Sequence, residues 1–153
     1  FHTTGLIHSE LGFPTSDSQK ITEKLNRLRE KIEIHKDEIF MHKEFFTDKK
    51  IKVLMITFGS TVRSAVEAAE ELNREGIPTG VIQLITLWPF PYSLIEKFKD
   101  VPLIVIPEIN QGQLIEEIYK VVPDRNRIAG VNRFDGHPII PEEIITEVKK
   151  RYK

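Results

Sequence analysis

The chain has 153 residues, a length that fits one domain with a well-buried core and a small appendage. Its 22 Lys and Arg residues nearly balance its 23 Asp and Glu residues, which leaves a formal net charge of −1. Such a chain has no strong field to attract nucleic acid or an anionic membrane surface. Because the sequence contains no Cys, disulfides and thiolate-held iron–sulfur clusters are excluded within it.

Charged residues make up 29% of the chain and are mostly Lys and Glu, a composition that suits the ion-pair networks of thermophilic proteins. No apolar run approaches the roughly 18–20 residues needed to cross a bilayer. The sequence begins Phe1-His2-Thr3-Thr4-Gly5, without an initiator Met or the features of a signal peptide. We therefore expect a cytoplasmic protein whose natural polypeptide extends before Phe1.

Residues 1–48 are predicted to form an extended segment followed by a linker helix. Gly, Pro, Ser and Thr dominate residues 1–18, and a long charged helix is expected from about Ser18 to Phe46, with Ser16 or Asp17 as its N-cap. The helix carries a narrow apolar stripe, formed by Ile21, Leu25, Leu28, Ile32 and Ile39. This stripe fits either a surface helix on its own domain or a helix that links domains.

From residue 49 to residue 153 the pattern alternates between short apolar strands and helices. Strands are predicted over 52–58, 80–84, 101–107 and 128–131, and helices over 61–75, 92–98 and 113–121, with a last helix that opens at Pro141. This alternation indicates an α/β fold: a three-layer open parallel sheet with helices on both faces. In such a sheet, ligands gather beyond the carboxyl ends of the strands.

The first candidate site follows the first of these strands, at Gly59, Ser60, Thr61 and Arg63. Gly59 permits a tight turn, and the first-turn amides of the next helix are suited to a carboxylate or a phosphate. Arg63 adds a bidentate partner for such an anion. The alternative is a plain turn with an ordinary helix cap.

Two further loops lie at the same predicted edge. After the third strand, the side-chain amides of Asn110, Gln111 and Gln113 and the carboxylate of Glu108 surround Gly112, and they suit a polar ligand, a partner's backbone or a fixed interface loop. Arg133 and Asp135 follow the fourth strand, where they can pair with each other or reach across an interface.

The sequence lacks the usual catalytic and nucleotide-binding patterns, including GxxxxGK[ST], GxGxxG, GxSxG and HExxH. His35 and His42, seven apart on the predicted helix with Glu38 between them, are better explained by a solvated charged face than by a metal site. Asp135-Gly136 does not match a thiamine diphosphate motif, because Phe134 precedes it and the later Asn is missing. We therefore expect no catalytic, cofactor-binding or metal-binding residue in this chain.

Four ordered segments, together with the first residues of the chain, resemble the alpha subunit of 2-oxoacid:ferredoxin oxidoreductases, particularly the 2-oxoglutarate type. The initial stretch, 5–15, is similar to the place where that subunit's first domain ends, although Ser9-Glu10-Leu11 is less polar than the family pattern. The four segments are Gly59-Ser60-Thr61-Val62-Arg63-Ser64-Ala65, Ile85-Thr86-Leu87-Trp88-Pro89-Phe90-Pro91, Asn110-Gln111-Gly112-Gln113-Leu114 and Gly130-Val131-Asn132-Arg133-Phe134-Asp135-Gly136.

The resemblance implies a domain like the C-terminal domain of transketolase, within an enzyme that oxidatively decarboxylates a 2-oxoacid to an acyl-CoA. Thiamine diphosphate, Mg²⁺ and iron–sulfur clusters would be held by other domains or subunits, and ferredoxin would accept the electrons. The implied partners are the upstream alpha-subunit domain, the thiamine-binding beta subunit, gamma and ferredoxin-like subunits, and ferredoxin, with CoA as a substrate of the whole enzyme. The isolated chain would then be inactive and its strand-end loops would build interfaces.

Two other functions remain open at this point. One is a stand-alone anion-binding or regulatory α/β module that uses the Gly59 and Gly112 loops. The other is the matching domain of a different thiamine diphosphate enzyme.

Overall fold

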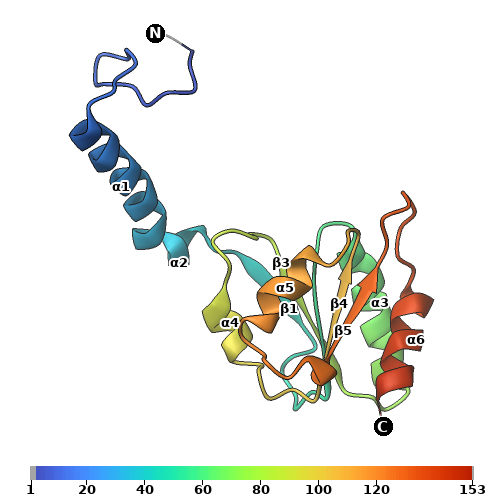
Figure 1. Ribbon diagram of the computed structural model, residues 1–153. Helices are drawn as coiled ribbons and strands as arrows, with labels where there is room; N and C mark the ends of the chain where they lie inside the picture. The colour runs from blue at the N-terminus through green and yellow to red at the C-terminus, as the bar shows by residue number, and fades with distance from the viewer. Residues whose placement is uncertain (1–2, 153) are drawn as a thin grey trace. The chain divides into compact units, whose positions relative to one another are not determined.

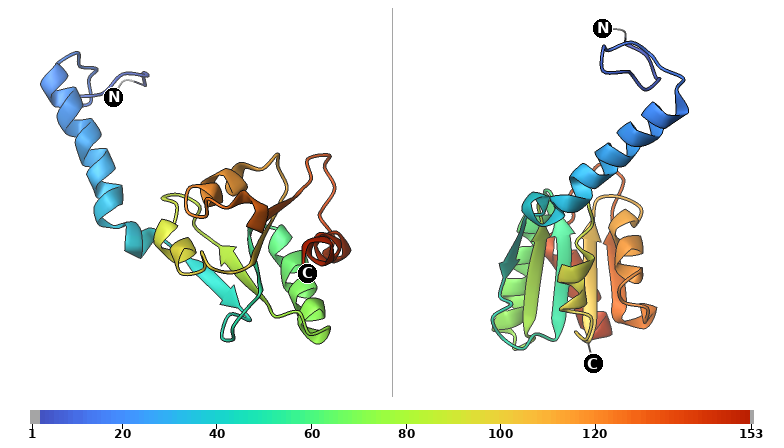
Figure 2. Two further views of the ribbon diagram at one scale, coloured as in Figure 1. Left: turned by 60° about the horizontal axis from the view of Figure 1, so that its bottom comes forward. Right: turned by 90° about the vertical axis from the view of Figure 1, so that its left-hand side faces the viewer.

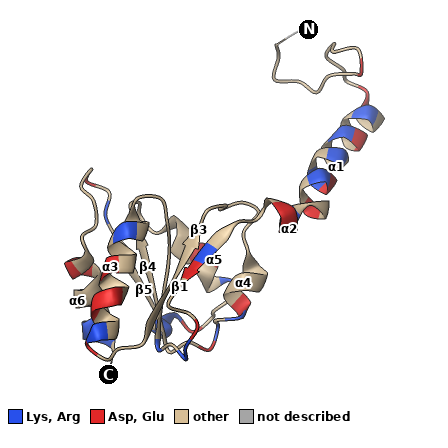
Figure 3. Cartoon of the chain, turned by 180° about the vertical axis from the view of Figure 1, so that it is seen from behind, with Lys and Arg blue, Asp and Glu red and all other residues tan. Residues whose placement is uncertain are grey.

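The computed structural model describes residues 3–152, which divide into one compact unit that ends at Ile39 and another that begins at Phe40. In the first unit, His8 and Pro14 form an isolated antiparallel bridge ahead of helix α1, Ser18–Ile34. Asp17 is the N-cap, since its Oδ1 accepts hydrogen bonds from the amides of Gln19 and Lys20 at 3.0 and 3.2 Å. Lys, Arg and acidic residues are interleaved along α1 (Figure 3), and none of its residues is buried.

The linker helix is shorter than predicted. Helix α1 ends at Ile34, the single turn α2 covers Lys36–Ile39, and His42–Phe45 form strand β1. His35 and His42 therefore do not share a helix face. The α/β unit starts at Phe40, whereas residue 49 was expected, because β1 pairs with the sheet.

The second unit is built on a five-stranded sheet in the order β1-β3-β2-β4-β5 (Figure 1). Strands β2 (Val53–Phe58), β3 (Thr79–Leu84), β4 (Leu103–Glu108) and β5 (Ile128–Asn132) are parallel, as predicted. The exception is β1, which runs antiparallel to β3 at one edge, with His42 opposite Leu84. The sheet is thus mostly parallel, and its antiparallel edge strand was missed.

Helices cover both faces of the sheet and give the predicted three layers (Figure 2). Helices α3 (Thr61–Arg74) and α6 (Pro141–Arg151) pack on the face that receives Val53 and Met55. Helices α4 (Tyr92–Glu96) and α5 (Gln113–Tyr119) pack on the face that receives Leu54 and Ile56, and the short 3₁₀ helix η1 (Arg125–Arg127) precedes β5. This alternation follows from the two-residue period of a strand, so β2 contributes to both cores.

A compact turn connects α3 to β3. Gly76 has φ +84°, a value that favours glycine, and its amide donates to the carbonyl of Asn73 at 3.1 Å. The Asn73 side chain then bridges to the strand, because it donates to the Thr79 carbonyl at 2.8 Å and accepts from the Thr79 amide at 3.0 Å. The end of α3 therefore determines where β3 begins.

Candidate functional site at the carboxyl edge of the sheet

The nine candidate residues all lie next to the carboxyl ends of β2, β4 and β5, which are adjacent in the sheet. Gly59 and Ser60 join β2 to α3, while Thr61 and Arg63 belong to the first turn of α3. Asn110, Gln111 and Gly112 join β4 to α5, and Arg133 and Asp135 follow β5. Because parallel strands end at the same edge, the fold gathers these loops along one side of the sheet.

The Gly59 and Asn110 loops meet at a surface pocket of about 310 Å³. Its lining consists of Phe58, Gly59, Ser60, Thr61, Ile109, Asn110 and Gln113. Arg133 and Asp135 do not line this pocket. The structure therefore joins two of the three predicted loops directly and places the third beside them.

Buried threonines support the β2 side of the pocket. The hydroxyl oxygens of Thr57 and Thr61 lie 2.6 Å apart, and Thr57 Oγ1 donates to the Pro107 carbonyl at 2.7 Å. These contacts connect β2 with α3 and with β4. Gly59 takes φ +63°, and no atom lies within 4 Å of a Cβ placed there, so its requirement for glycine is one of backbone conformation.

Polar side chains on the β4 side cap helix α5. Glu108 is fully buried, and its carboxylate accepts hydrogen bonds from the amides of Leu114 at 2.8 Å and Ile115 at 3.2 Å. Asn110 Oδ1 accepts from the amides of Gly112 at 2.8 Å and Gln113 at 2.9 Å. These oxygens satisfy the first amides of α5, so the Glu108 carboxylate serves the fold and not an external ligand.

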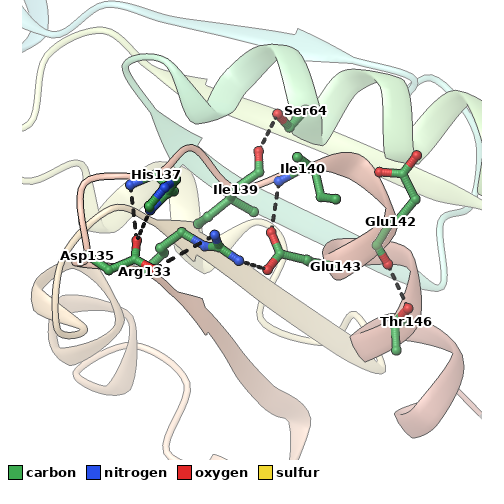
Figure 4. Close-up of polar contacts among 9 residues, drawn as sticks. All are labelled: Ser64, Arg133, Asp135, His137, Ile139, Ile140, Glu142, Glu143 and Thr146. Carbon is green, nitrogen blue, oxygen red and sulfur yellow. Dashed lines mark hydrogen bonds and ion pairs between the residues drawn. The ribbon is translucent and has the colours of Figure 1, made fainter.

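Arg133 is paired within the chain (Figure 4). Its Nη2 contacts Glu143 Oε1 near the start of α6, and its Nη1 lies 3.9 Å from Asp135 Oδ2. The other oxygen of Glu143 accepts from the Ile140 amide at 2.9 Å. Of the two roles considered for Arg133 and Asp135, pairing with each other is present, while the Glu143 contact connects the end of β5 with α6.

The loop between β5 and α6 has two further hydrogen bonds, one within the loop and one to α3 (Figure 4). Asp135 Oδ1 accepts from the His137 amide at 3.0 Å, and Ser64 Oγ donates to the Ile139 carbonyl at 2.7 Å. The hydrogen bond from the His137 amide is the main reason why the pKa of Asp135 lies below its ordinary value. Attraction to Arg133 lowers this pKa by a smaller amount. The contacts of Asp135 therefore favour its ionised form, and its hydrogen bond to His137 shapes this loop.

Thr57, Asn132 and Glu143 also contribute to this edge, and the sequence did not single them out. Asn132 Nδ2 donates to the Asn110 carbonyl at 3.2 Å and so connects two strand ends. A hydroxyl inside the otherwise apolar β2 run was one available signal, since buried hydroxyls need partners. The neutral hydroxyls and amides of the pocket suit hydrogen bonding and not proton transfer.

Other features of the described residues lie away from this edge. A larger cavity, of about 630 Å³, lies near the amino ends of β2 and β3, with Ile51, Gly76 and Pro78 among its lining residues. In residues 3–152, no group of His, Asp and Glu side chains has an arrangement that would hold a metal ion. Within the same range, no helix has both the length and the apolar character required to cross a membrane.

Residues 52–144 match the protein family described as pyruvate:ferredoxin oxidoreductase core domain II. The chain belongs to this family. It is 33% identical to the 2-oxoglutarate synthase subunit KorA of Methanocaldococcus jannaschii over 94% of this chain and 38% of the relative. It is 32% identical to the subunit of the same name from Archaeoglobus fulgidus, over 97% of this chain and 40% of the relative.

The architecture matches solved structures of two kinds. A 2-oxoglutarate:ferredoxin oxidoreductase from Magnetococcus marinus superimposes with a TM-score of 0.77 and 24% identity, over 98% of this chain and 26% of that chain. A transketolase mutant from Pichia stipitis gives a TM-score of 0.53 and 17% identity, over 72% of this chain and 18% of that chain. The predicted transketolase-like fold is confirmed. The chain spans about two fifths of the length of the KorA relatives.

Proposed function

We propose that this chain serves as domain II of the alpha subunit of a 2-oxoacid:ferredoxin oxidoreductase, with 2-oxoglutarate as the substrate. The observation that carries the proposal is its 33% identity to a 2-oxoglutarate synthase subunit over 94% of the chain. The whole enzyme would convert the 2-oxoacid to an acyl-CoA and reduce ferredoxin. In the Magnetococcus marinus structure, 2-oxoglutarate, coenzyme A and succinyl-CoA are bound, which agrees with this reaction class.

The role proposed for this domain is structural. Glu108 and Asn110 cap α5, and Arg133 pairs with Glu143, so the polar groups of the strand ends mainly organise their own loops. Iron–sulfur clusters would be held by other domains or subunits, because the chain has no Cys to ligate a cluster. Thiamine diphosphate and Mg²⁺ would also be held outside this chain, as the family resemblance implies. Its partners would be the upstream alpha-subunit domain, the beta and gamma subunits, a ferredoxin-like subunit and ferredoxin.

The candidate residues retain an interface or anion-binding role in this proposal. Ser60, Arg63 and Gln111 are exposed, and Ser60 lines the pocket where the Gly59 and Asn110 loops meet. A stand-alone anion-binding module is the competing function, and the position of this pocket at the first turn of α3 favours it. The matching domain of another thiamine diphosphate enzyme is supported only by the transketolase-like fold.

A domain exchange tests the proposal. In the Methanocaldococcus jannaschii KorA subunit, the segment aligned with this chain is replaced by this chain, and the hybrid is produced with the other subunits of that synthase. We expect an assembled complex that reduces a viologen dye with 2-oxoglutarate and CoA, because domain II supplies packing surfaces and not catalytic groups. The control hybrid carries the matching domain of Pichia stipitis transketolase, which shares the fold at 17% identity, and it should not assemble.

The isolated chain gives the second measurement. We expect no oxidoreductase activity and no heat of thiamine diphosphate binding by calorimetry. Assembly failure of the hybrid, or tight thiamine diphosphate binding by the chain alone, would contradict the proposal. Phosphate binding by the isolated chain that is lost in Arg63→Ala would instead favour the anion-binding module.

A further inference from the structure

An apolar surface lies at the corner of the sheet where β1 begins and β3 ends. Four exposed apolar residues lie on the two segments that meet there: Met41, Ile85, Leu87 and Trp88 are 55%, 45%, 41% and 71% exposed; we call them the apolar corner. Hydrogen bonds hold its two segments together, because the Ile85 and Thr86 amides both donate to the Met41 carbonyl, at 3.0 and 3.1 Å. Scattered exposed apolar residues are ordinary, but adjacent ones that include Trp and Met are typical of protein interfaces.

The loop that carries Leu87 and Trp88 packs against the core and against helix α5. Leu87 lines a pocket of about 150 Å³ together with Phe58, Phe90 and Leu114. The Leu87 side chain is therefore partly turned toward the core, although it is also exposed. The rings of Phe90 and Tyr92 pack edge to face with centroids 4.9 Å apart, and the Tyr92 hydroxyl donates to Glu117 on α5 at 2.6 Å. A surface fixed in this way loses little conformational freedom when it binds, which favours affinity.

The chemistry of the corner favours a protein surface as its occupant. The residues beside Leu87 and Trp88 in the chain are Thr86 and Pro89, whereas an anionic membrane surface would favour Lys or Arg beside the Trp. Nucleic acid would also require cations at this place. A desolvated apolar contact with few charges at its centre matches the core of a protein–protein interface.

The length of the relatives indicates which protein surface occupies the apolar corner. The chain matches 38% of the Methanocaldococcus jannaschii subunit over 94% of its own length, so most of that subunit has no counterpart here. In the proposed whole subunit, those residues supply further surfaces against which this domain can pack. We infer that the apolar corner is the docking surface for another folded domain of the same oxidoreductase alpha subunit, outside this 153-residue sequence. This inference rests on the proposed function.

The KorA hybrid described above provides the test, with hydroxyl-radical oxidation of individual residues read by peptide mass spectrometry. Trp88 is the only Trp of the chain, and its oxidation rate is compared between the isolated chain and the assembled hybrid at the same radical dose. We expect a decrease of about tenfold in the hybrid, because a Trp at the centre of an interface is almost fully desolvated. In the isolated chain, the rate should not change with protein concentration.

Substitutions give an independent readout. Trp88→Ser and Ile85→Ser should each lower the yield of assembled hybrid by about tenfold or more, while the isolated variants keep the circular dichroism spectrum of the parent. Ile85→Ser is the second variant in case Trp88→Ser affects folding. Ile140→Ser is the matched control, since Ile140 is 48% exposed and lies outside the corner; it should leave the yield unchanged.

The possible failures are distinct. A hybrid that assembles while Trp88 is oxidised as fast as in the isolated chain overturns this inference and leaves the proposed function intact. Protection that rises with the concentration of the isolated chain overturns it as well, because a second copy is then the occupant. A hybrid that does not assemble counts against the proposed function, and the inference fails with it.

Discussion

Arg133 illustrates how a side chain that suggests a binding site can instead hold its own domain together. The guanidinium lies between Glu143 and Asp135, and the side chains of Arg133 and Glu143 are only 30% and 32% exposed. Glu143 also accepts from the Ile140 amide, so one carboxylate holds both the end of β5 and the start of α6. Removing the Arg133 side chain would therefore loosen the loop between β5 and α6 even in the isolated chain.

We predict that Arg133→Ala lowers the free energy of unfolding by about 1 kcal/mol, a value set by the partial exposure of the pair. Glu143→Gln should cost a similar amount, and the double variant should cost less than the sum, because the two side chains interact. Urea unfolding followed by circular dichroism measures all three. Arg63→Ala, at an exposed Arg of α3, is the control and should change stability by no more than ~0.5 kcal/mol. Additive effects would show that the pair is not coupled.

At the residue scale, the sequence predicted which loops would lie at one edge but not their internal partners. Arg133 and Asp135 were expected either to pair with each other or to reach across an interface, and within the chain they pair. The Glu143 contact depends on the reversal of the chain between β5 and α6, which no local pattern specifies. Glu108 was grouped with possible ligand-binding residues because its carboxylate follows a strand, whereas its burial depends on how α5 packs.

The elements that were predicted well are those with strong local signals. Helix α3 begins at Thr61 and β2 ends at Phe58, where Gly59 and Ser60 separate an apolar run from a helical pattern. Strand β1 was missed because it has only four residues, and its partner residues Val81 to Leu84 lie far away in the sequence. Its intermediate–exposed–exposed–intermediate burial also lacks the alternation expected of a strand.

The contact between Tyr92 on α4 and Glu117 on α5 predicts a pH-dependent connection between these helices. The hydrogen bond to Glu117 raises the pKa of Tyr92 above 10.0, and Lys120 and Tyr92 lower the pKa of Glu117 below 4.5. The Tyr92 contribution to stability is therefore present below pH 10.0 and lost as the pH rises through the raised pKa. The Glu117 contribution is present above pH 4.5 and lost as the pH falls through the lowered pKa.

In a Glu117→Gln variant, we expect the ionisation midpoint of Tyr92 to fall toward 10.0, because the acceptor is no longer a carboxylate. The midpoint is read from phenolate absorbance as the difference between each protein and its Tyr92→Phe counterpart. Tyr152→Phe is the control and should leave this difference unchanged. Equal midpoints with Glu117 and with Gln at this position would mean that the hydroxyl bond is absent in solution.

Strand–helix alternation was sufficient to predict a three-layer α/β fold, which the similar solved structures confirm, although the sheet is mostly and not wholly parallel. The start of the unit was placed too late, because residues 42–45 carry no signal strong enough to separate them from the preceding helix.

We predict that a fragment of residues 40–153 folds as a monomer, whereas a fragment of residues 49–153 melts at a temperature lower by on the order of 10 °C. The shorter fragment lacks β1 and leaves β3 as an open edge of the sheet, which invites pairing with other chains. Thermal unfolding and sedimentation measure both effects. Equal melting temperatures and equal monomer content would show that the sheet does not need β1.

The position of strand β2 affects how the α/β unit unfolds. It lies between β3 and β4, and its successive side chains enter opposite cores, with Val53 and Met55 on one side and Leu54 and Ile56 on the other. Both layers of helices pack on this six-residue strand, so loss of β2 would expose both cores to solvent. We therefore expect the α/β unit to unfold in a single cooperative transition, as most single domains under about 150 residues do.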